Sequence, residues 1–193
     1  MRRGLPAAAA LLLCAGLAAG WPPARAAGGT APLRAKGWRL ALPGYAYRFP
    51  RDHGAHPAFR TEWWYYSGRL RGEAGERYAF MLTFFRTGLR PPGRGDPPRK
   101  SRWALRDLYI AHFSLLDVGA GRHRYFERFS RGALGEAGTS REGLRVWLRR
   151  WRAEGRMEEG RYVQEIFAEA KGVRLRLRLD PQKGPVIHGK GGV

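Results

Sequence analysis

Apolar and polar side chains alternate with a period of two residues along much of this chain, which is typical of strands in a sheet. The pattern is clearest where Arg174, Arg176 and Arg178 alternate with valine and leucine. Glycine-containing turns at 72–75 and at 172 predict hairpins between neighbouring strands. Because helical periodicity is weak, we expect an all-β domain, either a barrel or a sandwich. About eight strands are expected, near residues 38–49, 62–70, 77–86, 103–117, 123–129, 144–152, 162–171 and 173–179.

A polar, histidine-bearing loop precedes the most aromatic of these strands. The loop, residues 50–57, begins and ends with proline and contains Asp52, His53 and His56. Proline excludes a helix there, whereas four consecutive aromatic residues at 63–66 favour a half-buried strand. A period of two places Glu62 on the same face as the second and fourth of these aromatic residues. Loop and strand are therefore expected to form the rim of a pocket.

The first 26 residues have the pattern of an export signal. Arg2 and Arg3 precede an apolar run at 5–19, and Ala-Arg-Ala at 24–26 is a small-x-small cleavage pattern. The run is shorter than the roughly 20 residues that a membrane-spanning helix needs. We therefore expect a signal peptide at 1–26, a mobile leader at 27–37, one domain at 38–193, and a periplasmic or secreted protein.

The strongly basic composition does not by itself indicate a nucleic-acid-binding protein. The formal net charge is +20, but the cations are spread through the expected strands, where they suit a solvated sheet face. An anionic membrane surface is the second interpretation of the charge, and nucleic acid is not expected as a partner. Cys14, the single cysteine, lies in the expected signal, so the domain would contain no disulfide and no thiolate metal ligand.

Three segments make the chain recognisable. Residues 52–70, DHGAHPAFRTEWWYYSGRL, are followed by AHFSLLD at 111–117 and ERFSRGALGEAG at 127–138. Together they resemble the AttH-like family, which includes carotenoid 1,2-hydratases and is built from two lipocalin-like β-domains. The resemblance implies a lipocalin-like antiparallel β-barrel for residues 38–193. It also implies a second β-domain, which is not part of this chain and could be encoded downstream.

Hydration of a carbon-carbon double bond needs a general acid, a base for water, and a surface that stabilises a cation. The candidate acids and bases are Asp52, His53, Glu62 and His112. The expected ligand-binding residues, which offer aromatic faces or line the pocket, are Trp63, Trp64, Tyr65, Tyr66, Phe80, Phe84 and His112. Each has a structural alternative: a turn for the Asp52-His53 pair, an ion pair for Glu62, and core packing for the aromatic residues and His112.

These residues support two main functional hypotheses. The first is an exported lipocalin-like module that binds a hydrophobic, isoprenoid or lipid-like ligand. The second is a hydro-lyase that adds water to an acyclic carotenoid, and a weaker third is a basic surface-binding protein. No metal and no cofactor are expected, since hydrolase, metalloprotease, P-loop and dinucleotide motifs are all missing from the sequence.

Overall fold

The computed structural model describes residues 37–92 and 105–189, all within one unit, Arg34–Val193. The expected signal peptide and nearly all of the leader lie outside the described residues. So does part of residues 88–101, where four prolines and three glycines predict an exposed loop. Among the residues described, no helix has the length and apolar character needed to cross a membrane.

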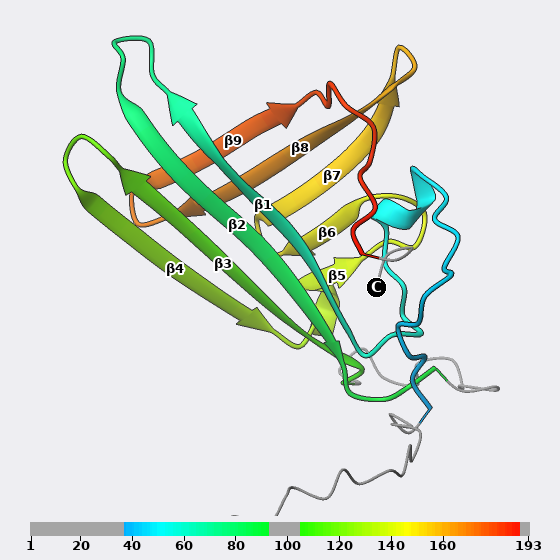
Figure 1. The fold of residues 1–193 in the computed structure, drawn as a ribbon. Coiled ribbons are helices and arrows are strands. Elements are labelled where there is room, and N and C mark those ends of the chain that lie inside the picture. The colour runs from blue at the N-terminus through cyan, green and yellow to red at the C-terminus, as the bar shows by residue number, and fades with distance from the viewer. Residues whose placement is uncertain (1–36, 93–104, 190–193) are drawn as a thin grey trace, which may run out of the picture. The chain divides into compact units, whose positions relative to one another are not determined.

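In the described part of the chain, nine antiparallel strands form two sheets that face one another (Figure 1). The first sheet has the order β1-β2-β3-β4 and the second the order β5-β6-β7-β8-β9. Within each sheet, strands that are consecutive in sequence pair with one another. Two short 3-10 helices, η1 (Arg51–His53) and η2 (Ala133–Gly135), accompany them. The strands are β1 (Thr61–Arg71), β2 (Arg77–Gly88), β3 (Asp107–Asp117), β4 (Arg122–Ser130), β5 (Ala137–Thr139), β6 (Arg145–Leu148), β7 (Trp151–Glu158), β8 (Arg161–Ala170) and β9 (Val173–Leu179).

The core lies between the two sheets and is filled by side chains from both. Phe84 of β2, Phe113 of β3 and Trp151 of β7 are almost completely buried, and Phe113 meets Trp151 edge to face at 5.9 Å. Alternate residues of each strand point inward, as the period of two requires. In β1, Trp64 and Tyr66 pack against this core, whereas Trp63 and Tyr65 face outward.

The prediction of an all-β, lipocalin-like antiparallel fold is confirmed. In the described residues, strand pairing gives two separate facing sheets and does not close them into one continuous barrel. The individual strands differ from expectation in three places. The short strand β5 forms where the sequence predicted none. No strand forms at residues 38–49, and the expected strand at 144–152 is split between β6 and β7 by a turn. That turn contains Arg149 with a positive φ of 55°. Glycine favours this conformation, so an arginine at this position gave no sequence signal for a turn.

Candidate functional site

The loop before β1 is fixed by hydrogen bonds around His56. The imidazole Nε2 lies 3.1 Å from Oδ1 of Asp52, and Nδ1 lies 3.1 Å from Oε1 of Glu62. The backbone N–H of His56 also donates to Glu62. One imidazole therefore joins a carboxylate of η1 to a carboxylate at the start of β1.

Arg86 of β2 holds the other side of Glu62. Its Nε donates to Oε2 of Glu62 at 2.8 Å, and one Nη donates to Oδ1 of Asp107 at 2.8 Å. The other Nη donates to the carbonyl oxygen of Phe59 at 2.6 Å. The side chain is only 2% exposed, so a buried cation is satisfied by two carboxylates and a carbonyl. This network ties the loop to the end of the first sheet.

Asp52 is stabilised as a carboxylate. Burial would raise its pKa, but the backbone N–H of Arg48, the guanidinium of Arg51 and the ring of His56 all donate to it and lower the pKa to about 2. The hydroxyl of Tyr45 also donates to Asp52, at 3.3 Å. Asp52 is therefore ionised at neutral pH and is not a source of protons.

The two histidines of the loop have opposite electrostatic environments. The hydrogen bond to Glu62 is the largest influence on His56 and raises its pKa, with a further contribution from Asp52 that outweighs burial. Burial lowers the pKa of His53, whose ring stacks on Tyr162 of β8 with centroids 4.8 Å apart and planes 5° apart. Phe49 packs on His53 as well, at 4.6 Å. Among the described residues, no side chain or backbone group hydrogen-bonds to the ring nitrogens of His53.

His53 lies between two cavities. The smaller one, about 290 Å³, is bounded by the loop and the start of β1, including Glu62 and Trp64. The larger one, about 620 Å³, lies between the loop, β7, β8 and the segment after β9, and we call it the His53 cleft. Its walls are Phe49, Pro50, His53, Met157, Gly160, Arg161, Tyr162, Gln164 and residues 181–185.

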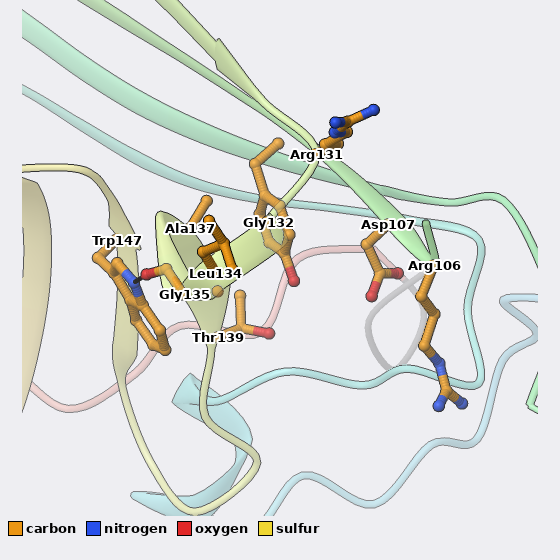
Figure 2. Close-up of a pocket in the computed structure, with 11 residues that line it drawn as sticks. Arg106, Asp107, Arg131, Gly132, Leu134, Gly135, Ala137, Thr139 and Trp147 are labelled. Carbon is orange, nitrogen blue, oxygen red and sulfur yellow. Dashed lines mark hydrogen bonds between the residues drawn. The ribbon is translucent and has the colours of Figure 1, made fainter. Parts of the chain in front are cut away.

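A third cavity, of about 510 Å³, lies near η2 and β5 (Figure 2). Asp107 and Thr139 contribute to its wall, together with Trp147, whose Nε1 donates to the carbonyl oxygen of Gly135 at 3.0 Å. Figure 2 shows that the guanidinium groups of Arg106 and Arg131 extend away from each other. Because the two cations do not converge, this cavity is a weaker candidate for an anionic ligand than its composition suggests.

The expected site residues do not form one group. Asp52, His53 and Glu62 meet at the loop, as the sequence predicts for a pocket rim. His112 lies on the outer face of β3, with Nε2 3.1 Å from Oε2 of Glu127. Among the described residues, no three His, Cys, Asp or Glu side chains are placed to hold a metal ion.

The expected ligand-binding aromatic residues fall into three environments. Phe80 and Phe84 are buried in the core. Tyr66 is mostly buried, which raises its pKa, and its hydroxyl donates to Oε1 of Gln164 at 3.2 Å. Trp64 is half-buried, and its Nε1 donates to the carbonyl oxygen of His53 at 3.0 Å. Trp63 and Tyr65 face outward.

Two important residues of the site were not singled out from the sequence. Arg86 could have been found from the sequence, because the alternation along β2 places it on the same inward face as Phe84. A charged side chain on a buried face needs buried partners of opposite charge. Tyr162 had none, since its ring contact with His53 and its hydrogen bond from the backbone N–H of Leu144, 2.8 Å, both depend on the tertiary fold.

Comparisons with known proteins support the fold and identify the family. The crystal structure of a protein assigned as AttH from Nitrosomonas europaea superimposes with a TM-score of 0.65 and is 32% identical in sequence. The match covers 80% of this chain but 44% of that one, so this chain spans less than half the length of its structural relative. No curated protein matches the sequence. Residues 40–193 match the AttH-like family model, and this chain therefore belongs to the AttH-like family.

Proposed function

We propose that this protein is an exported, lipocalin-like module that binds an apolar, lipid-like small molecule in the His53 cleft. The observation that supports this most directly is the composition of the cleft, where Phe49, Met157 and Tyr162 surround a histidine whose pKa is lowered by burial. A volume of about 620 Å³ lies in the usual range for small-molecule sites. The wall combines this apolar surface with polar side chains, including Gln164 and Lys183, which suits a mostly hydrophobic ligand with one polar end.

The rim of the cleft favours a ligand with a negatively charged end. Lys183 lies on the wall, and no described residue forms an ion pair or hydrogen bond with its ammonium group. Arg161 also belongs to the wall, and it pairs with Asp180 at 2.7 Å. A fatty-acid-like molecule could place its chain against Phe49 and Met157 and its carboxylate near Lys183.

The geometry supports binding better than hydration. Protonation of a carbon-carbon double bond requires a strong acid, but Asp52 is ionised and Glu62 is paired with Arg86. His56 has the raised pKa of a potential acid, yet both of its ring nitrogens are engaged by carboxylates. A hydro-lyase would therefore depend on His53, and conversion of an acyclic carotene that is lost in His53→Ala is the result that would favour this second function.

The binding proposal is tested with cis-parinaric acid, a polyene fatty acid whose fluorescence rises in an apolar site. We expect saturable binding by the wild-type protein and at least about tenfold weaker binding by Met157→Glu, which places a carboxylate in the cleft. Val118→Glu is the matched control, because Val118 is also exposed and lies outside the cleft. Absence of saturable binding, or equal affinity in the two variants, would contradict the proposal.

Export is tested separately, since the binding site does not depend on it. The expected cleavage after residue 26 predicts a mature protein that begins at Ala27 and is recovered from the periplasm or medium. Mass spectrometry of the purified protein measures this N-terminus directly, and an uncleaved cytoplasmic product would contradict export.

A further inference from the structure

The outer face of the first sheet is unusually aromatic for a surface exposed to water. Trp63 and Tyr65 of β1 are 65% and 56% exposed, and Tyr125 and Phe129 of β4 are 49% and 56% exposed. Strand register aligns Trp63 with Phe85, Ile110 and Phe129 in one row across all four strands. These side chains form a continuous patch, which we call the aromatic face. Such patches usually mark an interaction surface.

The outer face of the second sheet has the opposite character. Arg174, Arg176 and Arg178 of β9 point outward, as the alternating sequence predicts. Ion pairs cross this face, including Arg156 with Glu165 at 2.8 Å and Arg174 with Glu169 at 2.9 Å. The same molecule therefore has one sheet face suited to water and one that resembles half of a sheet-on-sheet interface.

The histidine and the carboxylate of the aromatic face have partners within it. Oε2 of Glu127 lies 3.1 Å from Nε2 of His112 and accepts a hydrogen bond from the hydroxyl of Tyr125 at 3.3 Å. The ring of His112 also contacts those of Phe85 and Tyr125, at 5.3 and 5.6 Å. Covering the face would therefore not leave its histidine or its carboxylate without a partner.

The distribution of charge identifies the occupant. The three adjacent rows that start at Trp63, Tyr65 and Ser67 contain no lysine or arginine, although the chain has 36 of these residues. An anionic membrane would be attracted to cations that this face does not offer. Because the full sequence carries a net charge of +20, two copies of the chain repel one another least where they meet through surfaces without cations.

We propose that a second copy of this chain covers the aromatic face, giving a two-fold dimer with the first sheets packed against each other. A two-fold axis lets one surface serve as both halves of the interface, so no further binding patch is needed.

Sedimentation velocity and light scattering of the purified protein test the proposal. We expect a dimer at about 100 µM, and a monomer for the double variant Trp63→Ser with Phe129→Ser. Met157→Ser is the matched control, because Met157 is 55% exposed on β7 of the other sheet, and it should remain dimeric. Circular dichroism checks that all variants keep the wild-type strand content.

Salt gives a second, independent measurement. Because apolar contact forms the interface and the net charge opposes it, raising NaCl from about 0.05 M to 0.5 M should strengthen the dimer. An interface made of ion pairs would weaken over the same range. A wild-type monomer at about 100 µM, a dimer that survives the double substitution, or a dimer that dissociates in salt would each overturn the proposal.

Discussion

Substitution of Arg86 by methionine tests whether the buried network is what fixes the loop to the sheet. The change preserves most of the apolar stem but removes a cation that donates to Glu62, Asp107 and the carbonyl of Phe59. Glu62 and Asp107 would then remain close together at the end of the core without their shared counter-charge. The unfavourable free energy comes mainly from these two carboxylates, because the arginine itself no longer has to be desolvated.

Breaking a buried ion pair by removing one partner typically costs about 3–5 kcal/mol of stability. For a domain of this size, that corresponds to a fall in Tm of roughly 6–20 °C. The matched control is Arg122→Met, which removes an arginine whose side chain is 66% exposed and pairs with Asp117 at 3.8 Å. Exposed pairs of this kind contribute about 0–1 kcal/mol.

Urea unfolding at neutral pH, followed by tryptophan fluorescence, measures both free energies of unfolding. Adding Glu62→Gln to Arg86→Met should recover part of the loss, because one of the two uncompensated charges is removed. If Arg86→Met is no more destabilising than Arg122→Met, the network is not what fixes the loop. The same conclusion follows if the added Glu62→Gln makes the loss larger.

Three further predictions concern the loop and the cleft wall. The lowered pKa of Asp52 stabilises the fold above the ordinary value of 3.8, so Asp52→Asn should be less stable than wild type at neutral pH, and the difference should vanish as pH falls to about 2 in urea titrations. The raised pKa of His56 stabilises the fold below 6.5 and the effect is lost at higher pH. His56→Gln should therefore be most destabilised near pH 6 and least near about pH 9. In Gly155→Ala the new Cβ would clash with the hydroxyl oxygen and the ring of Tyr162. Calorimetry should therefore show a loss of about 1–3 kcal/mol in the free energy of unfolding, and cis-parinaric acid should bind more weakly.

Strands with a clean alternation could be predicted closely from the sequence. The inward valine and leucine residues of β9 are separated by outward arginines. The two hairpins expected from the glycine-containing turns at 72–75 and 172, β1–β2 and β8–β9, both form. The division between β6 and β7 could not be predicted, because its turn uses Arg149 rather than glycine or asparagine. Because β3 has apolar residues on both faces, the sequence did not determine whether the His112 side chain faces the core or the outside.

Only the part of the candidate site whose residues lie close together in the sequence could be predicted. Asp52, His53 and Glu62 are separated by few residues, so a single loop and strand suffice to bring them together. Arg86 lies opposite Glu62 on the adjacent strand β2, so the register of the β1–β2 hairpin places it there. Tyr162 comes from the second sheet, and only the packing of the two sheets places it beside the loop. Contacts at such sequence separation depend on register and turn lengths, which hydrophobic periodicity does not encode.

The opposite environments of His53 and His56 explain how a short loop can be both fixed and open to a ligand. His56 is held at both ring nitrogens by carboxylates, so it anchors the loop and offers nothing to solvent. The ring of His53, three residues earlier, contacts Phe49 and Tyr162, and no described residue hydrogen-bonds to its ring nitrogens. Stacking leaves the ring nitrogens of His53 available while burial favours its neutral form. A neutral histidine in an apolar wall can donate or accept one hydrogen bond without bringing a charge into the cleft, which is the requirement for orienting a mostly hydrophobic ligand.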